Sequence, residues 1–294
     1  MIKYIYLFSI ILLIPRIGFA ITPNEVYSSV EVVVSKIEAI RSAANVSDKA
    51  RVPGIQVGKK PSHAYGKAIE LLEKISRFQA QKNIKPLILP NFLNVKVKPE
   101  NVLELVQLAE KELLNIIEKQ GVTYSLKEQS ETAKNKTPSD VYELIWQASY
   151  LMDTLIPAIS PADVLRNVAM IEQGLVNIAK AKGKSLTFPD ALTFTDKKPV
   201  DVSIQLYKLL YTIAKYERKI GMAPLIVPTF PAGKIKPEDT YDVTGNVLAD
   251  LARISAKLKI PAVTRSVKSN QKITPNHVYA QTLRINTGAQ QLLD

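Results

Sequence analysis

The chain has no cysteine and only two histidines, His63 and His277, among its 294 residues. The lack of cysteine excludes a disulfide framework, a thiolate metal site, a cysteine nucleophile and a lipid-modified N-terminal cysteine. Neither histidine belongs to an H-x-x-x-H or H-E-x-x-H motif, so no metal site is expected. We interpret both histidines as exposed polar residues in the first turn of a helix.

Sequence signatures of nucleotide binding and covalent catalysis are also missing. The chain contains no G-x-x-x-x-G-K-[ST] loop, no G-x-G-x-x-G loop and no G-x-S-x-G nucleophile turn. We therefore predict a protein that is not an enzyme, with no catalytic residues, no metal and no cofactor. The alternative is an enzyme with an unfamiliar site, which would have a deep pocket lined by several Glu, Asp, His or Tyr side chains.

The first twenty residues resemble an export signal. Lys3 gives a positive start, residues 4–14 form an apolar run, and Gly18-Phe19-Ala20 supplies the small residues that a signal peptidase recognises. We predict cleavage after Ala20 and a periplasmic or extracellular mature protein; the alternative is an uncleaved anchor. The apolar run is shorter than the roughly 20 residues that a bilayer span requires, and no later stretch is apolar enough to span a membrane.

Positive charge exceeds negative charge in the mature chain. Removal of Lys3 and Arg16 with the signal lowers the formal net charge from +12 to +10. This excess favours anionic neighbours such as lipid head groups or polyanionic polymers. Simple solubility is the alternative, because the lysines are scattered, and no specific nucleic-acid partner is expected.

A hexapeptide of the type Thr137-Pro138-Ser139-Asp140-Val141-Tyr142 recurs along the chain and sets its organisation. The aligned prolines are Pro23, Pro61, Pro99, Pro138, Pro161, Pro199, Pro237 and Pro275. Their spacing is 38 or 39 residues except for one step of 23, between Pro138 and Pro161. We interpret this as a tandem duplication of a four-repeat unit. The predicted organisation is a signal over residues 1–20, one unit over 21–158 and a second over 159–294.

Each hexapeptide has the chemistry of a helix start. Proline is favoured at the first helical position, and four of the prolines follow a threonine or serine that can cap the helix. The expected helices run for about 21 residues at a rise of 1.5 Å per residue. Several close twenty-two residues after the proline at residues that accept a left-handed backbone, namely Asn45, Asn83, Gly121, Gly183 and Gly221. The predicted fold is therefore all-α, with two four-helix bundle units built from ~38-residue repeats of a helix and an extended strap.

The segments between helices are proline-rich and apolar, above all residues 84–92 and 222–230. We expect extended, partly buried straps, with a third version at residues 186–194. About sixteen extended residues reach some 50 Å, which is longer than one helix. The helices of a unit could therefore run parallel, although an up-and-down bundle is also compatible. The linkers 46–59, 122–136 and 262–272 are more polar, and we expect them to be looser.

Aromatic residues near the helix starts are the candidate ligand-binding residues. They are Tyr27, Tyr65, Tyr142, Tyr241 and Tyr279, each four residues after a proline, together with Trp146, the only tryptophan. The functional interpretation is an aromatic site beside positive helix N-termini that suits an anionic or amphipathic ligand. The structural interpretation is that each tyrosine packs on the incoming strap with its hydroxyl in solvent, and that Trp146 packs between helices.

These observations predict an exported, non-enzymatic helical binding or scaffolding protein. Tandem four-helix bundles outside the membrane resemble the ectodomains of bacterial sensors, so the protein could be the ligand-binding partner of an envelope sensor. The alternative is a basic protein of the envelope surface that binds anionic lipid head groups or a polyanionic polymer. The partner could also be a protein, and the sequence does not specify the oligomeric state.

Overall fold

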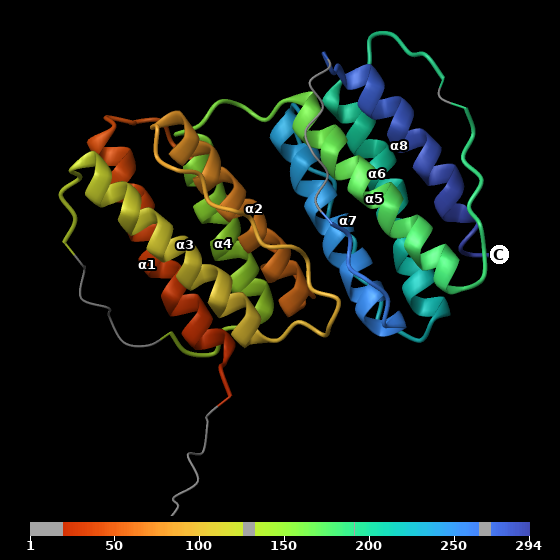
Figure 1. Cartoon of the computed structure of the whole chain (residues 1–294), viewed down its shortest axis with the longest axis horizontal. Helices are drawn as coiled ribbons and strands as arrows, with labels where there is room; N and C mark the ends of the chain where they lie inside the picture. Colours follow the sequence, from red (N-terminus) through yellow and green to blue (C-terminus); the bar gives the residue numbers. More distant parts are fainter. Residues whose placement is uncertain (1–19, 126–132, 191, 265–271) are drawn as a thin grey trace, which may run out of the picture.

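The computed structural model describes residues 20–125, 133–190, 192–264 and 272–294, and all regular secondary structure within them is α-helical (Figure 1). The helices are α1 (Pro23–Ala43), α2 (Pro61–Gln81), α3 (Pro99–Gln120), α4 (Pro138–Asp153), α5 (Pro161–Ala181), α6 (Pro199–Lys219), α7 (Pro237–Leu258) and α8 (Pro275–Gln290). The all-α class predicted from the sequence is confirmed. The expected signal up to Phe19 lies outside the described residues.

Every helix begins at one of the repeat prolines, as the hexapeptide predicts. In all eight, the side chain three residues after the N-cap accepts a hydrogen bond from the backbone N–H of the N-cap. The acceptors are Glu25, His63, Asn101, Asp140, Asp163, Asp201, Asp239 and His277. A full capping box has two hydrogen bonds, one accepted by the N-cap side chain and one accepted by the side chain three residues later. In the four helices with a lysine at the N-cap, the lysine side chain accepts no such bond, but the second bond is still present.

The helix ends also follow the expected chemistry. Asn45, Asn83, Gly121, Gly183 and Gly221 all have positive φ, and the following residue donates its N–H to a carbonyl five residues back. Lys259 occupies the equivalent position after α7, with φ of 55°. Two helices are shorter than expected, because α4 and α8 have 16 residues each.

The four helices of each unit run parallel. The starts of α1 to α4 meet around one small space lined by Pro23, Pro61, Pro99 and Pro138, and the starts of α5 to α8 meet in the same way. Long straps therefore carry the chain back along the bundle between successive helices of the same unit. This decides between the two arrangements that the sequence leaves open.

Two straps are fixed by equivalent side chains. The N–H of Leu87 donates to Gln79 on α2 at 2.9 Å, and the N–H of Leu225 donates to Glu217 on α6 at 2.7 Å. Phe92 and Leu225 are buried, whereas Ile88 is 86% exposed. These straps are irregular and partly buried, as expected.

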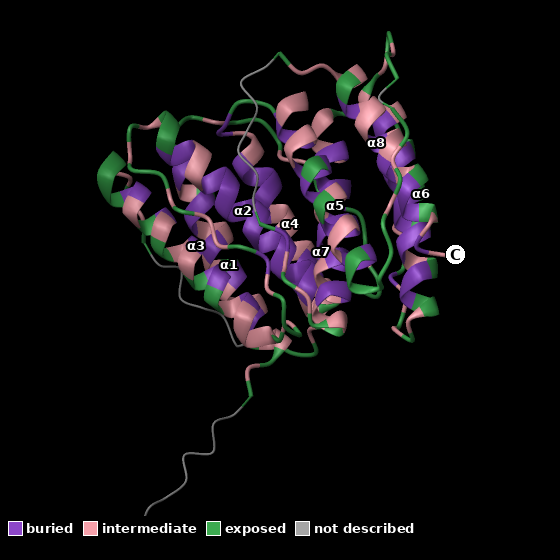
Figure 2. Cartoon of the chain, turned by 45° about the vertical axis from the view of Figure 1, so that its right-hand side comes forward, coloured by how far each residue is buried: buried purple, intermediate pink, exposed green. Residues whose placement is uncertain are grey.

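The two units have the same internal contacts and pack against each other through α2 and α7. In the first unit α1 and α2 each contact α3 and α4, and in the second α5 and α6 each contact α7 and α8. The origin of this correspondence in a duplication stays a prediction. Figure 2 shows the buried residues concentrated where the units meet, and α2 is buried without interruption from Ser62 to Ile75.

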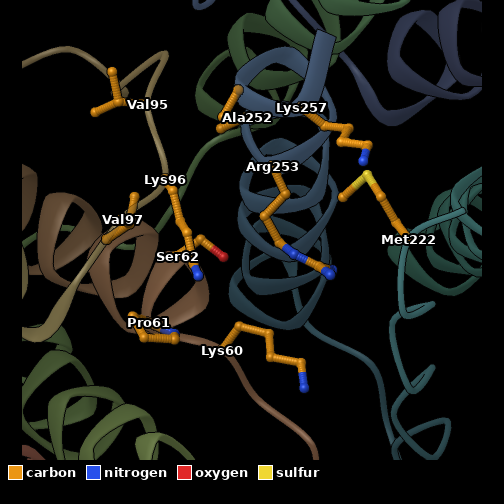
Figure 3. Close-up of a pocket in the computed structure, with 11 residues that line it drawn as sticks. Lys60, Pro61, Ser62, Val95, Lys96, Val97, Met222, Ala252, Arg253 and Lys257 are labelled. Atoms are coloured by element: carbon orange, nitrogen blue, oxygen red, sulfur yellow. The ribbon is translucent and has the colours of Figure 1, made fainter. Parts of the chain in front are cut away.

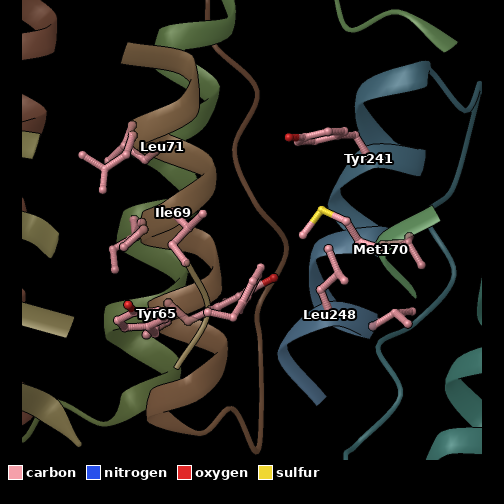
Figure 4. Close-up of a cluster of buried hydrophobic side chains, with 14 of the residues drawn as sticks. Tyr65, Ile69, Leu71, Met170, Tyr241 and Leu248 are labelled. Atoms are coloured by element: carbon pink, nitrogen blue, oxygen red, sulfur yellow. The ribbon is translucent and has the colours of Figure 1, made fainter. Parts of the chain in front are cut away.

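The units dock antiparallel. His63, near the start of α2, contacts Asp250, near the end of α7, whereas Glu73, further along α2, contacts Tyr241 in the first turns of α7. The chain therefore folds back in residues 154–160, between α4 and α5 (Figure 1). The interface combines these polar contacts with apolar ones, including Ile69 on α2 and Leu248 on α7 (Figure 4).

Replacement of Lys259 by glycine tests the helix-end chemistry. A non-glycine residue in the left-handed conformation carries a steric cost that glycine does not, partly offset by the greater freedom of glycine in the unfolded chain. We expect Lys259→Gly to raise the free energy of unfolding by about 0.5–1 kcal/mol in urea denaturation. The converse change Gly121→Ala, at φ of 61°, should lower it. An unchanged or lower stability of Lys259→Gly would contradict this account of the α7 end.

Candidate functional site

The face of α2 that meets α7 carries charged side chains that are buried. His63, Lys67, Glu70 and Lys74 are each at most 4% exposed. They are three or four residues apart and therefore lie on one face of the helix. Asp242, Asn246 and Asp250 form the corresponding buried stripe on α7. The docking surface is thus of mixed charge on α2, with both lysines and glutamates, and acidic and polar on α7.

Lys67 is the centre of this interface. Its ammonium group lies 2.7 Å from Glu70 of its own helix and 2.8 Å from Asp242 of α7. Burial alone would raise the pKa of Glu70. The neighbouring ammonium groups of Lys67 and Lys74 outweigh this effect and lower the pKa to about 2. Burial raises the pKa of Asp242 to about 6 despite its contact with Lys67. Removal of Lys67 would leave two buried carboxyl groups competing for fewer donors.

His63 is not an exposed residue, contrary to the expectation from the sequence. It is 4% exposed, and its Nε2 lies 3.0 Å from Asp250 across the interface. Its Nδ1 accepts the N–H of Lys60 at 2.8 Å, so one ring serves both the start of α2 and the contact with α7. His277, in the equivalent place on α8, is exposed as expected.

Three aromatic rings of α4 form a stripe beside this network. Tyr142, Trp146 and Tyr150 are four residues apart, and their successive ring centroids are 5.7 and 5.5 Å apart. The hydroxyl of Tyr142 donates to Asn246 at 3.1 Å, and that of Tyr150 donates to Asp242 at 3.1 Å. Both tyrosines are buried and burial raises the pKa of each, so they act as hydrogen-bond donors.

Cations stack on the stripe at both ends. The Lys59 ammonium lies 4.7 Å from the centroid of Tyr142, and the Arg51 guanidinium lies 4.2 Å from that of Tyr150. Lys67 lies 4.9 Å from the centroid of Trp146. These distances suit cation–π attraction. Both outer cations come from the linker between α1 and α2.

This linker is fixed, although its composition predicts a loose segment. Arg51 is paired with Asp239 of α7, and the N–H of Lys59 donates to Ser139 of α4 at 3.1 Å. The ammonium of Lys59 donates to Asn246 at 3.0 Å. The linker therefore passes between the units and contacts both.

A cavity of about 560 Å³ lies between the units at this place. Its walls include the linker from Arg51 to Lys59, Trp146 and Tyr150 of α4, the strap from Ile226 to Ala232, Tyr207 of α6, and Asp239, Asp242 and Asn246 of α7. We call it the inter-unit cavity. Apolar side chains at its rim are exposed, with Ile55 at 88% and Ile226 at 53%.

A second cavity, of about 470 Å³, lies between the start of α2 and the end of α7 (Figure 3). Lys60, Lys96, Arg253 and Lys257 line it together with apolar residues such as Met222. Three of these cations are exposed lysines, and Arg253 is already paired with Glu217 and Asp250. We call it the basic cavity.

The aromatic residues proposed from the sequence are distributed over several places. Trp146 lines the inter-unit cavity and Tyr142 packs directly against it. The hydroxyls of Tyr65 and Tyr241 donate to the Asn91 carbonyl at 3.2 Å and to Glu73 at 2.8 Å. The rings of Tyr27 and Tyr279 lie under Lys136 and Lys197, respectively. The buried hydroxyl of Tyr142 differs from the solvent-exposed hydroxyl expected of a packing residue.

Sequence reasoning missed Arg51, Lys59 and Tyr150. Tyr142, Trp146 and Tyr150 follow one another at intervals of four residues. This spacing puts them on one face of a helix, so the stripe could have been predicted from the sequence. The two linker cations have no such pattern.

No protein-family model matches the chain, and no curated protein or solved structure gives a significant match. In the described part of the chain, no three His, Asp or Glu side chains are grouped as a metal ion would require. None of the helices there has the length and apolar character of a membrane span.

Replacement of Lys67 by methionine tests the importance of the interface network. Loss of one member of a buried ion network leaves charge uncompensated and costs about 3–5 kcal/mol. We expect the free energy of unfolding of Lys67→Met to fall by this amount in urea denaturation at neutral pH. Lys111→Met, on the exposed face of α3, should change it by less than about 0.5 kcal/mol. Equal effects of the two changes would show that the network does not stabilise the docked units.

Proposed function

We propose that this chain is an exported, non-enzymatic binding protein whose small-molecule ligand occupies the inter-unit cavity. The cavity itself carries the proposal: about 560 Å³ is within the range of ligand-binding sites. Its walls combine aromatic and apolar residues with a few polar groups, which is the usual composition of such sites. The rest of the proposal, export to the periplasm or outside the cell, is supported by the sequence of residues 1–20.

The chemistry of the cavity supports binding over catalysis. Tyr142 and Tyr150 donate their hydroxyls to fixed partners and have raised pKa values, so neither is a base at neutral pH. Asp242 accepts from both Lys67 and Tyr150. The polar groups around the cavity are therefore largely engaged with one another. A ligand-binding partner of an envelope sensor is the role that we propose for such a protein.

The alternative function is binding to an anionic surface of the cell envelope. The net charge of the mature chain and the three exposed lysines around the basic cavity support it. Binding of this kind weakens steeply with salt, because exposed charges are screened. Binding of a ligand inside the aromatic inter-unit cavity should depend less on salt than binding to an anionic surface does.

The uncharged dye N-phenyl-1-naphthylamine tests the proposed function. Trp146 is the only tryptophan and lines the inter-unit cavity, so dye bound there should accept energy from it. We expect saturable energy transfer from Trp146 at neutral pH, little changed by 0.5 M salt. Phe230→Ala, which removes a ring of the cavity wall, should weaken it about tenfold, by analogy with a lost aromatic contact of about 1.4 kcal/mol.

Tyr211→Ala is the matched control, because Tyr211 is one turn from Tyr207 on α6, is 58% exposed and does not line the cavity. Its affinity for the dye should equal that of the unchanged protein. The absence of saturable energy transfer would contradict the proposed function. An equal loss of dye affinity in Phe230→Ala and Tyr211→Ala would contradict it too. If the protein instead sediments with anionic vesicles at low salt and releases them at 0.5 M salt, the surface-binding alternative is favoured.

A further inference from the structure

Two hydrogen-bond donors in the wall of the inter-unit cavity have no partner. They are Nη2 of Arg51 and the indole Nε1 of Trp146, and both atoms are buried. A buried polar group without a partner is costly, and an ordered water, an ion or a ligand can complete its hydrogen bonding. Both groups require an acceptor.

Lys59 adds a third donor to the same wall. It is 7% exposed, and its ammonium contacts an amide oxygen of Asn246 and the ring of Tyr142. Within the described residues, no carboxylate lies within ion-pair distance of this ammonium, in contrast to Lys67 and Lys74. Burial lowers the pKa of Lys59 to about 8, as expected for a cation that lacks a close counter-charge.

The two carboxylates of the wall, by contrast, are already engaged. Asp239 accepts from Arg51 and from the N–H of Lys236, and Asp242 accepts from Lys67 and Tyr150. Among the described residues that line the cavity, the buried side-chain atoms without a partner are donors only. The wall of the cavity therefore has an excess of unpaired donors and positive charge over free carboxylates.

The donors follow the aromatic stripe of α4, and apolar residues line other parts of the cavity. Lys59 stacks on Tyr142, Arg51 stacks on Tyr150, and Trp146 lies between the two tyrosines. Eight residues of helix separate the ends of this stripe, or about 12 Å. Val57 of the linker and Phe230 of the strap, which also line the cavity, present apolar surface.

We propose that the inter-unit cavity binds an organic monoanion, with its carboxylate or sulfonate toward Lys59 and its apolar body against the linker and strap. This inference rests on the proposed function and names the ligand class of that site. The apolar walls disfavour a bare inorganic ion. Asp239 and Asp242 in the wall disfavour a second negative charge on the ligand.

A matched pair of dyes separates the anion from the apolar body. 8-Anilino-1-naphthalenesulfonate has the rings of N-phenyl-1-naphthylamine plus one sulfonate. Both would be titrated into the full mature chain, with energy transfer from Trp146 as the readout. We expect the sulfonate to bind more tightly than the neutral dye, and Lys59→Met to lower the affinity for the sulfonate about tenfold or more, the loss expected for one charge-assisted hydrogen bond.

The affinity of Lys59→Met for the neutral dye should stay within about twofold of that of the unchanged protein. The neutral dye has no charge to pair with Lys59, so the change in its binding free energy should be well under about 1 kcal/mol. Lys59→Arg should retain the preference for the sulfonate. Lys257→Met, which removes a cation of the basic cavity, should affect neither dye. The urea midpoint of Lys59→Met should not fall, because Tyr142 still donates to Asn246.

Each other outcome overturns the inference in a recognisable way. An equal loss of both dyes in Lys59→Met would assign Lys59 a structural role and leave the proposed function intact. Loss of the sulfonate in Lys257→Met, but not in Lys59→Met, would place the anion in the basic cavity. Failure of both dyes to bind the unchanged protein would contradict the proposed function as well.

Discussion

The contact of Lys67 with Glu70 and Asp242 determines how the two halves of the molecule fit together. Carboxylates compensate an ammonium group that is buried to this extent, because desolvation of an isolated ion costs far more than a typical hydrogen bond returns. Glu70 belongs to the same helix, so Asp242 of α7 is the contribution of the second unit. The contact of His63 with Asp250 joins the same two helices at a second point, and the two contacts together restrict the register of α2 on α7. A buried ion pair adds little net stability compared with apolar packing, and we interpret this network as a device that specifies orientation.

The inter-unit cavity is a consequence of this docking. Its wall takes Trp146 and Tyr150 from the first unit, Asp242 and Asn246 from α7, and one irregular segment from each unit. Neither four-helix unit supplies these groups alone. The linker before α2 is held in place by the same docking, since Arg51 pairs with Asp239 of the second unit. Ligand binding and unit docking should therefore be thermodynamically linked, so that a ligand which contacts both units stabilises the docked state.

Much of the fold follows from local chemistry that the sequence displays directly. Proline at the first helical position, an acceptor two residues later and a residue tolerant of left-handed backbone twenty-two residues after the proline specify both ends of a helix. The straps are recognisable for the same reason, because proline and apolar residues are concentrated in them. These features depend on neighbours in the chain, so they were predictable without knowledge of tertiary contacts.

The docking face and most of the cavity were not predictable in this way. Lys67, Glu70 and Lys74 have the spacing of an ordinary solvated helix face, and nothing local to α2 shows that α7 covers it. The equivalent positions on α6 are Gln205, Lys208 and Thr212. The two units thus differ at these docking positions, but this difference has a meaning only once the partner helix is known. Trp146 was identified because it is unique, whereas Arg51 and Lys59 gain their role from two distant helices.

The antiparallel docking of two parallel bundles is the central claim, and a distance measurement tests it most directly. The chain has no cysteine, so spin labels can be attached to pairs of introduced cysteines without interference. Lys60 and Lys257 line the same cavity, whereas Lys236 is the N-cap at the opposite end of α7. Pulsed dipolar spectroscopy should give a short distance for the pair 60 and 257, and a distance longer by most of the ~33 Å length of a 22-residue helix for the pair 60 and 236. The reverse order would contradict the antiparallel arrangement, and equal broad distributions would show that the units are not docked.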